Sequence, residues 1–279
     1  MWTTRRATQV DRVRLVDLCR VAIGRDDYVP AFLDEFLRTG VVFVAEDGGQ
    51  VIGMMVYHDV PDGSAWLHAA RTHPDYRRQG VDTDLMAASE RLALQHRRSA
   101  LRLWAAASNR ASVEANRKYG FVERARFTRM RATAPGSAES VRVTPIRLDA
   151  GTWSLIANSP LLRMTATYLF HDFYFLPLTR ANARWLARGR ALWRLGTNGI
   201  SLSDDYEEPS GKDLQVQLLF GEPAVILAAA PAIARARGAT RVETFLPHDS
   251  GILETARLAG FEAMEWGQEA ILFERPVRR

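Results

Sequence analysis

Apolar and polar residues at the start of the chain follow a pattern that changes from helical to strand-like. Apolar positions recur at helical spacing over residues 11–24 and again over 31–38, which predicts two amphipathic helices. Two apolar runs follow, at 41–45 and 51–58, and the residues 47–49 between them are Asp-Gly-Gly. Such residues favour the left-handed backbone of a tight turn, so the two runs predict a β-hairpin.

The pattern continues as a strand, a basic turn and a helix. Residues 65–72 predict a buried strand, and helical spacing returns after Val81. Free backbone N–H groups and the dipole at the start of a helix attract anions, above all phosphates. Gly80 would let the backbone of the turn 73–80 approach a diphosphate closely, whereas an ordinary surface turn is the simpler alternative.

A second strand and helix lie further along the chain. Residues 100–105 predict a strand, and the stretch 108–121 predicts a short helix that is stopped by Gly120. With a first strand expected within residues 2–8, the elements follow the order β-α-α-β-β-β-α-β-α. This order predicts a mixed α/β sheet.

The two stretches together resemble the GNAT superfamily of acyl-CoA N-acyltransferases, over about the first 130 residues. The matching residues are Arg77, Gly80 and Asp82 in the basic turn, and Asn109, Ser112, Gly120 and Phe121 in the second stretch. In this family the basic turn holds a diphosphate, and the fourth strand splays from the fifth so that its free backbone groups hold the pantetheine. The resemblance therefore implies acetyl-CoA as a co-substrate and no metal ion.

The resemblance also assigns residues to the site by position. The cofactor-binding residues would be Ala70, Arg71, Thr72, Arg77, Arg78, Gln79, Gly80, Val81, Asp82, Thr83, Asn109 and Asn116. His68 would be the catalytic base, working through water, because arylalkylamine-type members carry a histidine there. Regular alternation places His68 on the same face of its strand as Thr72. A half-buried histidine that makes one hydrogen bond is the alternative.

Several positions depart from the family pattern. Asn116 stands where the family has its tyrosine acid, and Tyr119, one turn further on, either packs in the core or substitutes for it. Trp104 stands where some members carry a glutamate base. Asp82 replaces a small loop residue, so its carboxylate either caps the helix start or repels the diphosphate. A segment that lines the acceptor cleft of relatives contains Asp26, Asp27 and Tyr28, which would bind an ammonium group or remain solvated.

The pattern repeats beyond a Pro- and Gly-containing stretch at 134–140. The matching segments are 185–195 with 36–45, 214–220 with 65–72, 241–246 with 101–106, and Gly260-Phe261 with Gly120-Phe121. In place of the basic turn the second copy has Gly221-Glu222-Pro223. We therefore predict a tandem GNAT-like fold, unless the two α/β segments resemble each other by chance. Its parts would be an acyl-CoA-binding domain at 1–133, a linker at 134–140, and a degenerate domain without the diphosphate loop at 141–279.

Composition restricts the protein class. No apolar run approaches ~20 residues and the start of the chain lacks an apolar leader, which predicts no membrane association and a cytoplasmic location. The lone cysteine, Cys19, excludes an internal disulfide and a cysteine-based metal site. The net charge is +5, and all but two of the 37 basic residues are arginine. Because they form no basic arm with interleaved aromatic residues, nucleic-acid binding is disfavoured.

Three functions remain open from the sequence. The leading hypothesis is an N-acetyltransferase that transfers the acetyl group from acetyl-CoA to a primary amine, on a small molecule or a peptide, by direct attack in a ternary complex. The second is a non-catalytic, regulatory acyl-CoA-binding protein, and the third is a related fold that uses another donor such as aminoacyl-tRNA. The aromatic segment 161–178 would be core, a wall for an apolar acceptor, or the face of a homodimer.

Overall fold

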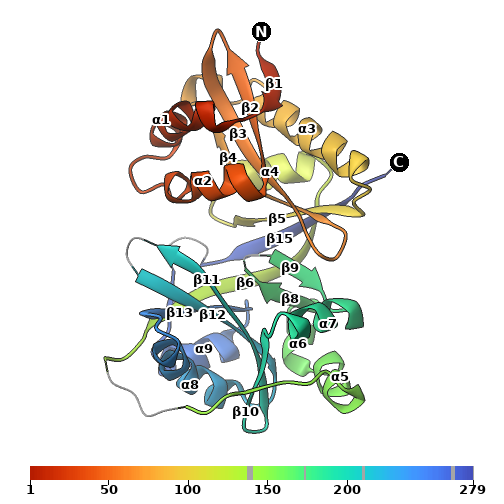
Figure 1. Ribbon diagram of the computed structural model, residues 1–279, viewed down its shortest axis with the longest axis vertical. Helices are drawn as coiled ribbons and strands as arrows, with labels where there is room; N and C mark the ends of the chain where they lie inside the picture. Colours follow the sequence, from red (N-terminus) through yellow and green to blue (C-terminus); the bar gives the residue numbers. More distant parts are fainter. Residues whose placement is uncertain (137–140, 173, 209–210, 265–267, 279) are drawn as a thin grey trace. The chain divides into compact units, whose positions relative to one another are not determined.

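The computed structural model describes residues 1–136, 141–172, 174–208, 211–264 and 268–278 (Figure 1). The chain divides into two compact units. The first comprises Met1–Leu103, Lys118–Val122 and Glu274–Arg279, and the second comprises Trp104–Arg117 and Glu123–Phe273. Domain boundaries at a linker of residues 134–140 remain a sequence-based prediction, and 137–140 lie outside the described residues.

The first half of the chain forms its elements in the predicted order. They are β1 (Thr3–Arg6), the 3-10 helix η1 (Gln9–Asp11), α1 (Arg12–Ala22), α2 (Val29–Thr39), β2 (Val41–Asp47), β3 (Gln50–Asp59), β4 (Ala65–Thr72), η2 (Pro74–Tyr76), α3 (Val81–Gln95), β5 (Ala100–Ala106) and α4 (Arg110–Lys118). The end of β5 and most of α4 belong to the second unit. This order confirms the mixed α/β class.

The first unit is a sheet with helices on both faces (Figure 1). Its strands lie in the order β1-β2-β3-β4-β5, with antiparallel neighbours except for the parallel pair β4–β5. On one face α1 and α2 contribute Leu15 and Leu33 to a buried cluster that includes Val56 of β3. On the other face lies α3, and Gly53 makes room for it, because an added Cβ would lie 2.5 Å from Val81.

The turn between β2 and β3 shows why this hairpin could be read from the sequence. Asp47 pairs with Gln50 across a two-residue turn, Gly48–Gly49. The two glycines have φ angles of +54° and +83°. Two-residue hairpin turns need positive φ at both positions, which residues with a side chain adopt at a cost.

The rest of the chain forms the second unit, apart from the end of its last strand. The elements are β6 (Val122–Thr133), β7 (Thr144–Pro145), α5 (Ala150–Ala157), α6 (Pro160–Met164), β8 (Tyr168–His171), β9 (Tyr174–Pro177), α7 (Arg180–Arg188), β10 (Leu192–Leu195), β11 (Asn198–Glu208), β12 (Gly211–Phe220), α8 (Pro223–Ala236), β13 (Arg241–Pro247), α9 (Ser250–Leu258), β14 (Glu262–Ala263) and β15 (Ala270–Pro276). No helix in the described parts of the chain has a stretch that could cross a membrane.

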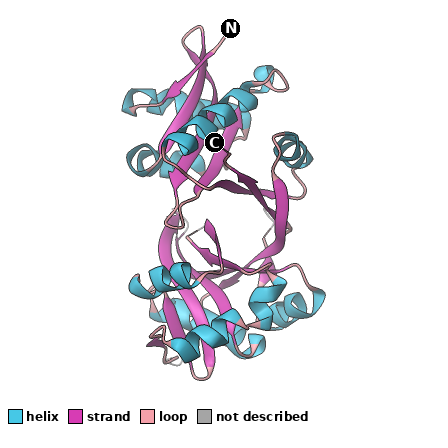
Figure 2. Cartoon of the chain, turned by 90° about the vertical axis from the view of Figure 1, so that its right-hand side faces the viewer, coloured by secondary structure: helices cyan, strands magenta, loops and turns pink. Residues whose placement is uncertain are grey.

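The sheet of the second unit is also covered by helices (Figure 2). Its strands lie in the order β15-β6-β13-β12-β11-β10-β7, with β14 beside β6, and the hairpin β8–β9 is separate. Helices α8 and α9 pack on one face, where Ile226, Leu253 and Val242 share a buried cluster.

The second half of the chain repeats the element order of the first half. The series α7-β10-β11-β12-α8-β13-α9 matches α2-β2-β3-β4-α3-β5-α4. Each series contains a parallel pair, β4–β5 or β12–β13, and the pairing stops after two residue pairs in the first and three in the second. The predicted tandem fold is therefore confirmed.

Candidate functional site

Strands β4 and β5 are neighbours only where they begin. Ala65 pairs with Leu101 and Trp66 with Arg102, and no further pair between these strands is present in the described residues. Strand β4 nevertheless continues to Thr72. The far part of this strand edge has backbone groups that an extended ligand could pair with, as an added strand would.

Strand β4 also contains a β-bulge. Met54 and Val56 of β3 pair with Arg71 and His68 of β4, so one residue of β3 faces two residues of β4. Ala69, one of the two, has a φ of +53°. This left-handed conformation costs about 1–2 kcal/mol for a residue with a side chain. Bulges of this kind re-aim side chains and are common beside active sites.

The bulge places His68 and Thr72 on opposite faces of the sheet. The His68 ring packs edge-on against Phe36 of α2, with 4.8 Å between the ring centroids. Thr72, in contrast, donates its hydroxyl to Asp82 at the start of α3, on the other face. The expectation that His68 and Thr72 share a face is therefore wrong, because the extra residue of the bulge reverses the alternation of side chains.

His68 is held in its neutral form. The side chain is half-buried. Burial lowers its pKa well below the usual value, and the positive potentials of His58 and Arg71 lower it further. A neutral imidazole has a lone pair that can accept a proton, but the lowered pKa makes it a weaker base than a free histidine.

Helix α3 begins with a run of backbone N–H groups that have no acceptor within the described residues. They belong to Arg78, Gln79, Gly80, Val81, Asp82 and Thr83. The first helical bond runs from the Asp84 N–H to the Gly80 carbonyl, at 3.1 Å. Positive φ angles at Arg78 (+62°) and Gly80 (+99°) bend the chain sharply here. Consecutive free amides at the start of a helix form a ready site for an anion such as a diphosphate.

The polar side chains of this loop have different roles. Arg77 donates an Nη2 hydrogen to the Ala22 carbonyl at 2.7 Å and so ties the loop to the end of α1. Gln79 folds back and donates to the Asp75 carbonyl at 2.6 Å. Arg78 is exposed. Of the two arginines beside the free amides, only Arg78 lacks such an anchor among the described contacts.

The first turn of α3 carries acidic residues. The carboxylate of Asp82 accepts the Thr72 hydroxyl of β4, so it points to the sheet rather than to the amides of its own helix. Asp84 accepts the indole N–H of Trp2 at 2.8 Å. The hydroxyl of Tyr119 lies 3.0 Å from that of Thr83, and burial raises its pKa. Tyr119 therefore stays protonated and supports the helix start.

Asp27 is neither solvated nor free to bind an ammonium group. Its carboxylate accepts two hydrogen bonds from Arg71, Nε at 2.7 Å and Nη2 at 2.6 Å, and both side chains are buried. The remaining Nη1 of Arg71 donates to the carbonyl of Ala70 at 2.9 Å. The guanidinium also lies 5.5 Å from the Tyr28 ring. Removing one partner of such a buried pair leaves an uncompensated charge, so the pair fixes this turn to β4.

Cys19 is unsuited to carry an acyl group. The residue is fully buried on α1, with its sulfur 3.9 Å from that of Met54. Burial raises the pKa of the thiol to about 12, so it is protonated at neutral pH. Only the thiolate is a good nucleophile.

Asn109, Asn116 and Trp104 belong to the second unit by contact. Asn109 accepts the Ser112 N–H at 3.2 Å, which makes it the cap of α4. Asn116 is buried, and its amide nitrogen has no partner within the described residues. Trp104 packs edge-on against Phe245 at 6.0 Å. The last contact supports a packing role for Trp104.

The corresponding helix start in the second unit is occupied. The Glu222 N–H donates to Asn198 Oδ1 at 2.7 Å, and Pro223, the first residue of α8, has no N–H. A side chain at Gly221 would collide with Asn198. The carboxylate of Glu222 adds negative charge at a place where a phosphate would need the opposite. These features support the predicted loss of the diphosphate loop.

The aromatic segment 161–178 packs inside the second unit. Phe175 lies 4.5 Å from Phe127, and Phe170 lies 4.5 Å from Phe245, measured between ring centroids. All four rings are buried. Core packing is therefore their role, and Phe173 lies outside the described residues.

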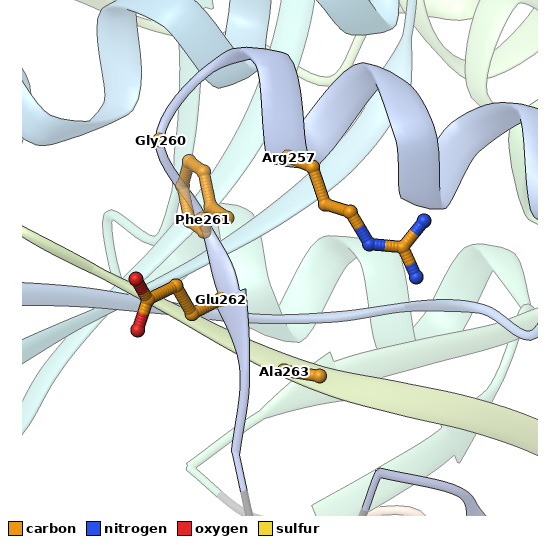
Figure 3. Close-up of a pocket in the computed structure, with 5 residues that line it drawn as sticks. All are labelled: Arg257, Gly260, Phe261, Glu262 and Ala263. Carbon is orange, nitrogen blue, oxygen red and sulfur yellow. The ribbon is translucent and has the colours of Figure 1, made fainter.

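A shallow cavity of about 360 Å³ lies at the end of α9 (Figure 3). Its lining residues are Arg257, Gly260, Phe261, Glu262 and Ala263. The charged side chains of Arg257 and Glu262 point in different directions, so they do not form one binding group. Across the described residues, no cluster of His, Cys, Asp and Glu is placed to hold a metal ion.

A comparison with known protein families agrees with this geometry. The sequence model of the acetyltransferase (GNAT) family matches residues 14–121, which include the diverging strands and the free amides of α3. Residues 14–121 are a GNAT acetyltransferase domain. No curated protein sequence matches the chain.

Solved structures extend the likeness of the GNAT fold to the whole chain. A GCN5-related N-acetyltransferase from Sphaerobacter thermophilus has 14% identity and a TM-score of 0.64, and the match covers 100% of this chain and 96% of that one. A tandem GNAT protein from the clavulanic acid biosynthesis pathway has 13% identity and a TM-score of 0.59, with 100% and 99% covered. At this identity the likeness concerns the fold, which is a tandem GNAT fold.

Two features of the site were missed in the sequence. One is the buried pair of Asp27 and Arg71, whose residues are 44 positions apart and carry no local signal. The other is His58, which stacks on His68 at 5.1 Å. Counting pairs outward from the turn 59–64 would have placed His58 opposite Trp66 and diagonal to His68, so this contact was readable from the hairpin.

Proposed function

We propose that the GNAT domain is an acetyl-CoA-dependent N-acetyltransferase that acetylates a primary amine of a small molecule or peptide. The observation that carries this proposal is the run of free backbone amides over residues 78–83. Six consecutive donors at a helix start, with the exposed charge of Arg78 beside them, suit the diphosphate of coenzyme A. The unpaired edge of β4, including Ala70 and Thr72, suits the extended pantetheine.

The proposed reaction is direct transfer. The lone pair of the acceptor amine attacks the thioester carbonyl carbon, the carbon–sulfur bond breaks, and coenzyme A leaves as a thiolate. The nitrogen gives up one proton, which His68 accepts through a water molecule. The high pKa of Cys19 argues against an acyl-enzyme step. For the thiolate, no acid is assigned, since Tyr119 is held at the helix start.

The alternative is a regulatory protein that binds acetyl-CoA without turnover. It is favoured by Asn116, because an amide cannot donate a proton usefully to the thiolate, and the family's tyrosine acid is missing there. The carboxylate of Asp82 in the first turn of α3 also weakens the attraction for a diphosphate. Three sequence-based predictions stay untested: the cytoplasmic location, the homodimer, and the primary amine of a small molecule or peptide as the acceptor.

Calorimetry of the full chain with acetyl-CoA tests the binding step. The wild type should bind, and Gly80→Val should not, because a β-branched residue cannot adopt a φ of +99° without displacing the loop. Gly63→Val is the matched control, since Gly63 also has a positive φ (+80°) and no atom within 4 Å of an added Cβ. Intact binding by Gly80→Val would show that the loop is wrongly assigned, and no binding by the wild type would point to another donor.

A thiol-release assay over a panel of primary amines tests turnover. We expect an amine-dependent release of coenzyme A that His68→Ala reduces by about 10²-fold or more, the usual contribution of a general base. Affinity for acetyl-CoA should change little. Tight binding with no release on any amine would favour the regulatory alternative.

A further inference from the structure

Three aromatic rings meet on the face of the sheet that carries α2. They belong to Phe36 of α2, His58 of β3 and His68 of β4. The two imidazoles stack at 5.1 Å with an interplanar angle of 26°. Phe36 meets His68 edge-on at 4.8 Å and His58 edge-on at 6.2 Å. Each histidine ring is therefore held between the other histidine and the phenyl ring.

The register between β3 and β4, together with Gly40, brings the two imidazoles together. His68 pairs with Val56 and therefore lies diagonal to His58, which pairs with Trp66. The bulge that follows His68 brings Arg71 to the same face. Gly40, which follows α2, leaves the space for the second imidazole. An added Cβ at Gly40 would lie 2.7 Å from Cε1 and Nε2 of His58. Gly40 has a φ of −112°, so its backbone does not require glycine, and the packing of His58 does.

The charges around the stack differ for the two rings. His68 faces His58 and Arg71, which both oppose a positive charge on it. His58 lies beside the carboxylate of Asp59, which partly offsets the lowering of its pKa by burial. Helix α2 contacts the two histidines through Phe36, and its charged residues Glu35 and Arg38 are exposed, so the helix adds no charge to the contact. His58 is therefore the ring that takes the first proton as the pH falls.

We propose that His58 is a positioning residue for His68: its stacked ring fixes the orientation of the base, and its own protonation keeps His68 neutral to lower pH. Two imidazoles in contact do not both become charged easily, so the pair accepts its protons in two separated steps. This inference rests on the proposed role of His68 as the base. It assigns a function to His58 of the neighbouring strand β3, a residue to which the family resemblance gives no role.

The pH dependence of kcat/KM tests the inference. In His58→Phe the ring stack is kept and the second charge is lost, so His68 should protonate more readily. The acidic limb of the profile should move to higher pH by about half a unit to one unit, as expected for two charges in contact. Turnover above pH 8 should change by less than about threefold, because both histidines are neutral there.

Gly40→Ala provides a second variant that displaces the His58 ring and leaves its chemistry intact. We expect it to lower kcat through the disturbed orientation of His68, with the affinity for acetyl-CoA unchanged. His248→Gln is the control for loss of a histidine, since His248 is bonded to Thr128 in the second unit. Thermal unfolding of each variant separates loss of fold from loss of function.

The outcomes distinguish the inference from the proposed function. If His68→Ala abolishes turnover but His58→Phe leaves the acidic limb in place, the inference is wrong and the base stands. If His68→Ala leaves turnover intact, the assignment of the base fails first. An equal shift in His248→Gln would also overturn the inference, because the effect would then not depend on the stack.

Discussion

At the scale of single residues, Asp82 and Asp84 lower the positive potential at the start of α3. Asp82 is the nearer of the two to the free amides, since it is one of the six residues that carry them. Its bond to Thr72 ties the helix start to the end of β4. The carboxylate thus has two opposing effects: it stabilises the loop and repels an approaching phosphate.

Asp82→Asn separates these two effects. The amide can still accept the Thr72 hydroxyl, while the negative charge is removed. We expect acetyl-CoA to bind about three- to tenfold more tightly, since a charge near a helix start is worth about 1 kcal/mol. Calorimetry at low and at high salt would measure this gain, which should shrink as salt screens the charge.

Asp84→Asn is the matched control for that variant. Asp84 is bonded to Trp2, at the outer side of the helix, so its replacement should give a smaller gain. Weaker binding by Asp82→Asn would mean that the ionised carboxylate holds the loop in its binding shape. In that case the regulatory alternative would lose one of its supports.

At the scale of elements, the start of α1 depends on one buried carboxylate. Asp11 accepts two hydrogen bonds from Arg5 of β1, both at 2.8 Å, and one from the Thr8 N–H at 2.9 Å. The Arg5 guanidinium holds the pKa of Asp11 down at about 2, against the opposing effect of burial. The ionised carboxylate thus stabilises the junction between the first strand and the first helix.

This junction should make the stability of the protein depend on pH in acid. Because the pKa of Asp11 is lower in the folded state than in the unfolded state, its contribution is complete above the unfolded value of about 4. The contribution is lost as the pH falls towards 2. In Asp11→Asn we expect a free energy of unfolding at pH 7 that is lower by about 1–2 kcal/mol, allowing for solvent around Arg5.

Denaturant unfolding between pH 7 and pH 2.5 would measure the effect. The difference between the wild type and Asp11→Asn should be largest near neutral pH and should shrink below pH 4. Asp34→Asn is a suitable control, since Asp34 pairs with Arg12 at the exposed surface of the neighbouring helices. A difference that does not depend on pH would mean that Asp11 acts through packing and not through its charge.

At the scale of the whole molecule, the two units share a fold but differ at one helix start. In the first unit the amides before α3 are free. In the second unit Asn198 occupies the Glu222 N–H, and Pro223 removes another donor. We therefore expect one acetyl-CoA per chain, bound by the first unit.

Calorimetric stoichiometry would check this prediction. The wild type should give one site per chain, and Gly80→Val should remove it entirely. Glu222→Gln, which removes the carboxylate before α8, should leave both the stoichiometry and the affinity unchanged. Two sites, or binding that survives in Gly80→Val, would place a coenzyme site in the second unit.

Much of the fold could be predicted from the sequence because its signals are local. A few neighbouring residues are enough to predict the Gly48–Gly49 turn, the helices with apolar faces and the glycine before α3. The repeat was readable because the element order and the Gly-Phe endings recur. The site was less accessible. The bulge at Ala69 reverses the faces of β4, and no residue type marks it, since an alanine stands where the backbone favours glycine.

The occupied start of α8 has a consequence for the history of the second half. Restoring an anion site there would need a new glycine-bearing loop, loss of Pro223 and release of Asn198, all at once. A variant with only one of these changes gains no ligand, and release of Asn198 alone also loses its bond to the Glu222 N–H. Point mutation therefore does not lead back to a second active centre, and directed evolution towards a double enzyme should begin with an inserted loop.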